Sequence, residues 1–174
     1  MLFRRRRQRP AVMAAYHRIV ERARDPLFFA RWGVPDTLDG RFETLALHGF
    51  LVLNRLKADR AETAAFAQDL FDMMFADLDR GVREMGATDL GVGRHVKAMA
   101  RGFYGRIAAY ESGLGNRAAL EEALRRNLFG TVEPEAAVVT AAAAYMRRQA
   151  AALAAVPAAS LLAGEVPFAP VEEG

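Results

Sequence analysis

Cysteine is missing from this sequence, and other residue types that carry chemistry are scarce. The chain has no Cys and only three His among its 174 residues, which excludes disulfides, thiolate metal sites and cysteine nucleophiles. His17, His48 and His95 lie far apart, and none has a second ligand at a recurring metal-site spacing. The lack of cysteine fits a reducing compartment. We therefore expect no metal, no cofactor and no catalytic residues, and we predict that the protein is not an enzyme.

Long apolar runs are also missing. The most apolar stretch, residues 45–53, is about half of the roughly 20 residues that a membrane span requires. No apolar segment of signal-peptide character follows the N-terminal arginines. We expect a cytoplasmic protein whose contact with the inner membrane, where it occurs, is peripheral.

Positive charge is concentrated at the N-terminus. The net charge is +3, and the first ten residues hold five arginines, so the rest of the chain is slightly negative; the five are Arg4, Arg5, Arg6, Arg7 and Arg9. One interpretation is a solvated, flexible arm over residues 1–10. The other is attachment to an anionic membrane surface or to the ribosome, since each cation near such a bilayer contributes about 1 kcal/mol. No DNA partner is expected.

The sequence is rich in alanine, and its apolar residues recur every three or four positions, which is typical of helices. We predict an all-α, single-domain bundle of about six helices near residues 11–24, 39–56, 59–86, 88–114, 117–128 and 134–155. The clearest apolar stripe steps by four and three along one face, through Phe66, Leu70, Met74, Leu78, Val82 and Met85. We expect the chain to divide into a basic arm at residues 1–10, a helical domain at residues 11–156 and a tail at residues 157–174. The last segment holds three prolines, so we predict an extended tail whose Val166, Phe168 and Val171 lie in a groove.

Two further patterns have competing interpretations. Gly91 and Gly93 precede Arg94 and Lys97, which resembles a phosphate site at a helix N-terminus. No strand precedes them, so we interpret the pattern as a tight helix entry followed by a solvated basic turn. A connecting segment at residues 27–32 is unusually aromatic. It either packs against the core or forms an apolar surface that receives a partner.

Several short motifs, in order from about residue 16 to 114, resemble the ubiquinol–cytochrome c chaperone family. They are Ala23-Arg24-Asp25-Pro26-Leu27-Phe28-Phe29, Gly33-Val34-Pro35-Asp36-Thr37, Gly40-Arg41-Phe42-Glu43, Leu47-His48-Gly49-Phe50, Arg83-Glu84-Met85-Gly86, Asp89-Leu90-Gly91-Val92-Gly93 and Phe103-Tyr104-Gly105-Arg106. The resemblance implies an assembly chaperone that binds newly made cytochrome b and assists biogenesis of the cytochrome bc1 complex. It also implies that no cofactor is needed.

A chaperone for a membrane protein needs an apolar surface that excludes water from its client. Our hypothesis is a client-binding groove lined by Phe28, Phe29, Trp32, Phe50, Met99, Phe103 and Tyr104. A second set of residues is interpreted either as internal ion pairs or as rim contacts, and comprises Arg41, Glu43, Arg83, Glu84, Asp89 and Arg106. The alternatives are a peripheral lipid- or quinone-binding protein and a small helical enzyme with titratable groups gathered in a pocket.

Overall fold

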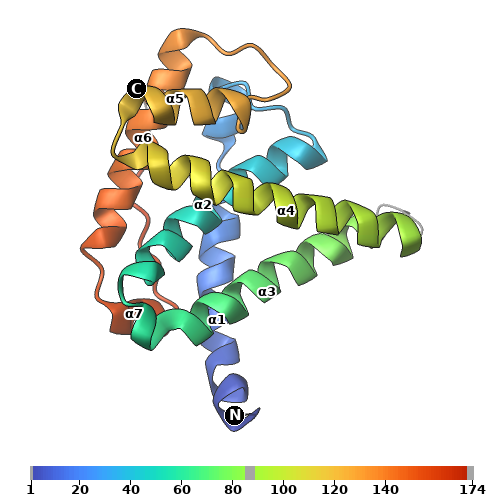
Figure 1. Cartoon of the computed structure of the whole chain (residues 1–174), viewed down its shortest axis with the longest axis vertical. Coiled ribbons are helices and arrows are strands. Elements are labelled where there is room, and N and C mark those ends of the chain that lie inside the picture. The colour runs from blue at the N-terminus through green and yellow to red at the C-terminus, as the bar shows by residue number, and fades with distance from the viewer. Residues whose placement is uncertain (1, 85–88, 172–174) are drawn as a thin grey trace.

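The computed structural model describes residues 2–84 and 89–171, and in these ranges the chain consists of helices and connecting loops (Figure 1). The longer helices are α1 (Leu2–Ala23), α2 (Leu38–Ala58), α3 (Arg60–Glu84), α4 (Asp89–Leu114), α5 (Arg117–Arg126) and α6 (Ala136–Ala154). Two short helices are the π-helical turn η1 (Leu27–Arg31) and α7 (Ala158–Leu162). The predicted all-α bundle is confirmed.

Helix α2 is the centre of the bundle. It contacts α1, α3, α4 and α6, which explains why its middle is apolar on all sides. Ala46, Leu47 and Val52 are fully or almost fully buried. At Gly49 an added Cβ would lie 2.8 Å from the sulfur of Met74, so glycine is what allows α3 to approach α2 here.

Helices α3 and α4 extend together away from the rest of the molecule (Figure 1). The predicted stripe on α3 is confirmed for Phe66, Leu70, Met74 and Val82, which are buried. Leu78 is half-buried, and Met85 lies outside the described residues. The two helices pack on each other, and α4 also contacts α2 and α5. Helix α3 also packs against α1 and α2, whereas the side of α4 that carries Tyr104 is exposed to solvent.

Two boundaries differ from the sequence-based expectation. Helix α1 begins at Leu2 and passes through Pro10, whereas we expected a flexible arm that ends at Pro10. Proline removes one backbone donor but does not always end a helix. The expected extended tail first forms α7, with Pro157 at its N-cap position and Leu161 buried beneath it. Only after Gly164 does the chain become extended.

Candidate client-binding site

The seven apolar residues of the predicted groove do not line one groove. Phe28 and Trp32 pack against α2 and α6, where their rings lie near Tyr145. Phe103 and Tyr104 lie at the other side of α2, next to Phe71 of α3. The structure therefore divides the aromatic side chains into two groups with different exposure.

The first group, the inner cluster, comprises Phe28, Trp32, His48, Tyr145 and Phe168. Ring centroids are 5.2 Å apart for Phe28 and Trp32, and 5.5 Å apart for Trp32 and Tyr145. The Phe28–Trp32, Phe28–Tyr145 and His48–Phe168 pairs meet edge to face, an arrangement that aromatic quadrupoles favour. The inner cluster is thus a packed joint between η1, α2, α6 and the C-terminal segment.

A fully buried histidine fixes this joint. The His48 Nδ1 lies 2.7 Å from the carbonyl oxygen of Thr44, and its Nε2 lies 2.8 Å from the hydroxyl of Tyr145. A carbonyl can only accept, so Nδ1 carries the proton and Nε2 accepts the Tyr145 hydrogen. Burial lowers the pKa of His48 to about 4, which keeps the ring neutral.

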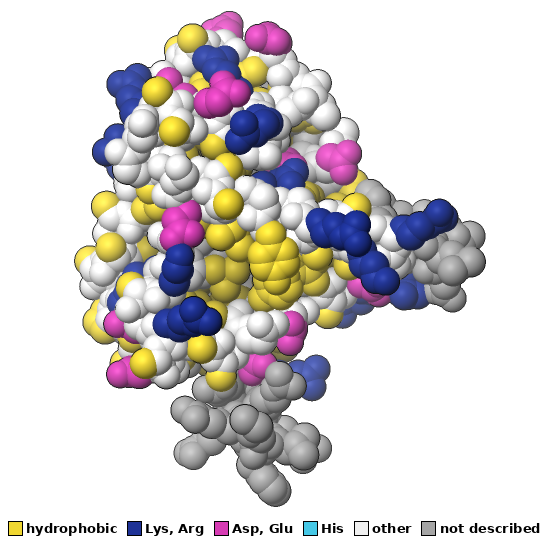
Figure 2. Space-filling model, in the orientation of Figure 1, with side chains coloured by type: hydrophobic (Ala, Val, Ile, Leu, Met, Phe, Trp, Pro, Cys, Tyr) yellow, Lys and Arg dark blue, Asp and Glu magenta, His cyan; other side chains and the backbone are white. Residues whose placement is uncertain are grey.

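The second group, the α3–α4 aromatic face, comprises Phe71, Phe75, Phe103 and Tyr104. The rings of Phe71 and Tyr104 lie 5.6 Å apart and are tilted by 34°. Phe103 is fully buried, whereas Tyr104 is 61% exposed. Figure 2 shows hydrophobic side chains at the surface between α3 and α4. This face offers an apolar surface to solvent that rests on a rigid core beneath it.

Four residues of the predicted groove are core residues in this conformation. Phe28, Phe50, Met99 and Phe103 are at most 6% exposed, so they cannot contact a client without rearrangement. Phe29 and Trp32 are half-buried, and Tyr104 is exposed. The expectation of a single groove is therefore wrong for this conformation, because aromatic residues at helical spacing here serve the core.

A basic stripe leads to the exposed tyrosine. Arg94, Lys97 and Arg101 precede Tyr104 by ten, seven and three residues, so all four share one face of α4, and all four are exposed. Figure 2 shows Lys and Arg side chains along the projecting end of α4, beside the hydrophobic patch. The predicted basic turn at Arg94 and Lys97 therefore continues along α4 to Arg101, and the resulting basic stripe ends at the α3–α4 aromatic face.

One predicted charged pair joins two helices. Glu43 of α2 accepts hydrogen bonds from both Nε and Nη2 of Arg106 on α4, with an Nε–Oε2 distance of 2.6 Å. Burial raises the pKa of Glu43, and Arg106 opposes this rise. Burial also lowers the pKa of Arg106, but the pair with Glu43 outweighs it and raises that pKa. The guanidinium also lies over the ring of Phe42. This pair is an internal ion pair of the predicted kind.

The other members of the charged set do not join this pair. Arg41 bonds to Asp36 at 2.6 Å and Arg83 bonds to Asp79 at 2.6 Å, and both pairs lie at the surface. Glu84 is exposed, and the side chain of Asp89 lies outside the described residues. The six residues are therefore not one network.

The basic arm is only partly described. The side chains of Arg4, Arg5, Arg6 and Arg7 lie outside the described residues. Arg9 is exposed and lines an open cavity of about 810 Å³ between α1 and α3. Across this cavity, Tyr16 donates a hydrogen bond to Asp77 at 2.7 Å. Burial raises the pKa of Asp77, but Tyr16 and Arg80 outweigh it and lower that pKa.

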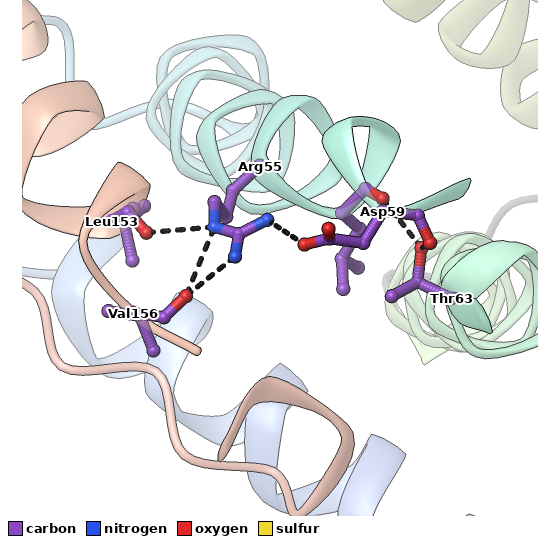
Figure 3. Close-up of polar contacts among 6 residues, drawn as sticks. Arg55, Asp59, Thr63, Leu153 and Val156 are labelled. Carbon is purple, nitrogen blue, oxygen red and sulfur yellow. Dashed lines mark hydrogen bonds and ion pairs between the residues drawn. The ribbon is translucent and has the colours of Figure 1, made fainter. Parts of the chain in front are cut away.

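Sequence reasoning missed Arg55, which ties α2 to the end of α6 (Figure 3). Its guanidinium donates to the carbonyl oxygens of Leu153 at 3.1 Å and Val156 at 2.7 Å, and to Asp59 at 2.5 Å. The hydroxyl of Thr63 closes the α2–α3 corner by donating to Leu56 at 2.6 Å. No local motif marks the link from Arg55 to α6, since the two carbonyls that it binds lie about 100 residues away.

The described residues contain neither a cluster of metal-ligating side chains nor a helix that could span a membrane. Within residues 2–84 and 89–171, no group of three or more His, Asp or Glu side chains is placed to hold a metal ion. In the same ranges, no helix combines the length and the apolar character that crossing a bilayer requires.

Comparison with known proteins bears on the chain as a whole. The family model described as ubiquinol-cytochrome C chaperone matches residues 30–168. The chain is 28% identical over 119 residues to the ubiquinol-cytochrome-c reductase complex assembly factor 1 of Xenopus laevis, covering 68% of this chain and 60% of that protein. It is 28% identical over 120 residues to the Mus musculus protein of the same name, covering 68% and 41%. The chain thus spans less than two thirds of these relatives.

A solved structure resembles this one over nearly its full length. The crystal structure of the Cbp3 homolog from Brucella abortus superposes with a TM-score of 0.86 at 36% identity, covering 99% of this chain and 97% of that chain. The similarity therefore includes α7 and the C-terminal segment, which the sequence motifs did not reach. The chain belongs to the ubiquinol-cytochrome C chaperone family.

Proposed function

We propose that this protein is an assembly chaperone that binds newly made cytochrome b and assists biogenesis of the cytochrome bc1 complex. The observation that carries the proposal is the family match over residues 30–168. The matched relatives are named as assembly factors for ubiquinol-cytochrome c reductase. That cytochrome b is the client is the more specific part of the proposal, and photocrosslinking tests it.

The α3–α4 aromatic face is the client-binding surface that we assign. The exposed Tyr104 lies against the half-buried Phe71, and both rings lie above the buried Phe75 and Phe103. Exposed aromatic side chains supported by a packed core are typical of interaction hot spots. A membrane-protein segment in water exposes apolar side chains, and their burial against this face removes apolar area from water. The client is held reversibly, and no reaction step is required.

The basic stripe supports a peripheral position at the anionic inner-membrane surface. Arg94, Lys97 and Arg101 would face lipid headgroups while Tyr104 beside them contacts the client. Losing three cations near an anionic bilayer weakens binding by about 3 kcal/mol, or roughly 100-fold. The residues Arg4, Arg5, Arg6, Arg7 and Arg9 would add to this attraction. This role places the chaperone on the cytoplasmic side of the membrane where the client is inserted.

The test of the client is photocrosslinking during cytochrome b synthesis. A photoreactive residue at position 104 or 71 is expected to capture cytochrome b. Position 132 is the matched control, because Val132 is also an exposed apolar residue, at 41%, but lies outside α3 and α4. Capture from position 32 but not from 104 would move the site to the inner cluster. Capture of no cytochrome b from any position would contradict the client assignment, as would unchanged cytochrome b abundance and haem content after gene deletion.

The membrane contact has a separate test. The triple variant Arg94→Gln, Lys97→Gln, Arg101→Gln is expected to lose co-sedimentation with vesicles that contain anionic lipid. The control variant Arg60→Gln, Arg126→Gln, Arg147→Gln removes the same charge from other exposed sites. Equal loss in both variants would mean that overall charge, and not the stripe, attracts the membrane. Lipid or quinone that co-purifies with the protein in stoichiometric amount would favour the lipid-binding alternative.

A further inference from the structure

The chain after α7 is held against the bundle by a small number of specific contacts. Residues 165–171, here called the C-terminal strap, run in an extended conformation across α1 and toward η1. The strap follows Gly164, whose φ of +89° favours glycine. A Cβ at Gly164 would lie 2.6 Å from the carbonyl oxygen of Ala11, so the strap crosses α1 at close range.

A buried glutamine binds the backbone of the strap. The side chain of Gln149 on α6 is fully buried. Its Nε2 donates to the carbonyl oxygen of Ala169 at 2.9 Å, and its Oε1 accepts from the amide of Ala169 at 2.8 Å. Both polar ends of Gln149 are therefore used on one peptide residue. This amide pair recognises an extended backbone without reading a side chain.

The neighbouring residue supplies the side-chain recognition. The ring of Phe168 meets the ring of His48 edge to face at 5.4 Å. The Arg22 guanidinium lies 5.9 Å from the centroid of the same ring, within reach of a cation–π interaction. One aromatic anchor next to one residue bound through its backbone is a recurring way to bind extended peptides.

The strap lies at the surface and ends the described chain. Val166 is buried in the core and anchors the start of the strap, whereas Phe168, Ala169 and Val171 are only partly buried and Pro167 and Pro170 are exposed. An open cavity of about 690 Å³ runs along one edge, between the strap and the charged residues of α1. Detachment of residues 167–171 therefore breaks the Gln149 pair and the ring contacts of Phe168, while Val166 can stay buried.

We propose that the groove between α1, η1 and α6 is a peptide-binding site, which the C-terminal strap occupies in cis and which an extended segment of a partner protein occupies when the strap leaves. The partner segment has an aromatic residue followed by a residue with a free backbone N–H, flanked by proline or small residues. Proline is excluded at the position of Ala169, because it has no amide hydrogen for Gln149. This site is separate from the α3–α4 aromatic face, and the inference does not rest on the identity of the client there.

A labelled peptide with the sequence of residues 163–171 tests the groove in the full-length protein. The strap competes with it at an effective concentration of about a millimolar, so the unmodified chain is expected to bind the peptide weakly. Phe168→Ala in the chain weakens the strap and should raise peptide affinity by about 10-fold or more. Adding Gln149→Leu should abolish this gain. A peptide with Ala169→Pro is the matched negative control.

Three results would overturn the proposal. The first is a folded Phe168→Ala chain, judged by circular dichroism, that binds the peptide no better than the Ala169→Pro control. The second is a Phe168→Ala chain that elutes as a dimer on size-exclusion chromatography, since this assigns the groove to a second copy of the chain. The third is an amide of Ala169 that exchanges its hydrogen no faster than core amides in the unmodified chain.

Hydrogen exchange of the unmodified chain measures whether the strap detaches. The amide of Ala169 is expected to exchange about 100-fold or more faster than core amides such as those of Val52 and Leu153, because local opening costs less than global unfolding. Equal exchange rates would show that the strap leaves only when the bundle unfolds. That result would overturn the inference even where the Phe168→Ala chain fails to fold.

Discussion

The two aromatic groups of this protein differ in hydrogen bonding and in exposure to solvent. In the inner cluster, His48 and Tyr145 hydrogen-bond to each other and the C-terminal strap covers their outer side. On the α3–α4 aromatic face, Tyr104 stacks on Phe71 and leaves most of its surface in water. Similar residue types therefore form a closed joint in one region and an open surface in the other.

The difference follows from the number of elements that meet at each place. Four segments converge on the inner cluster, whereas the outer side of α3 and α4 has no further helix in the described chain to cover it (Figure 1). An open apolar surface costs solubility, and for this reason we assign the proposed client-binding role to this face and not to the inner cluster.

Neighbouring residues on α4 give the sharpest test. Phe103→Ala is expected to lower the free energy of unfolding by about 4 kcal/mol, because it leaves a cavity among buried aromatic rings. Tyr104→Ala should change it by less than about 1 kcal/mol, since its side chain is exposed. Urea denaturation measures both. Equal destabilisation by the two substitutions would contradict the open character of this face.

The ion pair between α2 and α4 is the next test, because it lies between the two regions. Glu43→Ala leaves the guanidinium of Arg106 without its partner and is expected to cost about 3 to 4 kcal/mol. The control is Arg41→Ala, which removes the exposed pair with Asp36 and should leave the free energy of unfolding nearly unchanged, because solvent screens this pair. A small effect of Glu43→Ala would show that the pair does not fix the position of α4.

The buried histidine predicts a pH dependence that belongs to the inner cluster. The pKa of His48 is lowered from 6.5 to about 4 in the folded state, so the unfolded state binds the proton more tightly. Stability from neutral His48 is fully present above pH 6.5 and is lost as the pH falls toward 4, by about 3 kcal/mol. Thermal unfolding between these pH values measures it. His48→Asn should remove most of this dependence, and its persistence would assign it to another group.

Arg55 gives the smallest of the four effects. Arg55→Ala is expected to cost about 2 kcal/mol, because the carbonyls of Leu153 and Val156 lose a charged donor. Arg55→Lys should recover only part of this, since a single ammonium cannot reproduce the planar fork. Denaturation of both variants at one pH provides the comparison. Full recovery by lysine would mean that charge alone, without the geometry in Figure 3, holds α6.

The helices were predictable because their signals are local. The three-four spacing of Phe66, Leu70 and Met74 is a property of one segment, and those residues are buried as expected. Thr37 and Asn116 cap α2 and α5 through backbone amides three residues away, which is also local chemistry. Pro10 was misleading, because proline is typical of a helix start but does not always end a helix when it falls in the interior, and α1 passes through it.

The candidate site was predictable only in part. Tyr104 was included in the predicted client surface and is exposed. Phe28, Phe50 and Phe103 are aromatic residues that were included for the same reason, but they are buried. Sequence spacing states which residues share a helix face and leaves open whether another helix covers that face. Phe71, the ring that stacks on Tyr104, was missed for the same reason.

Local signals in the sequence were enough for the all-α class, for the bounds of α2 to α6 to within a few residues and, through ordered motifs, for the family, but not for the start of α1 or for α7. These depend on backbone propensity and on periodicity within single segments. Only the tertiary structure decided which aromatic residues stay open, that Glu43 pairs with Arg106, and that Gln149 binds the strap. Each of these depends on groups about 20 to 100 residues apart, and a contact at such a separation is set by how the helices pack.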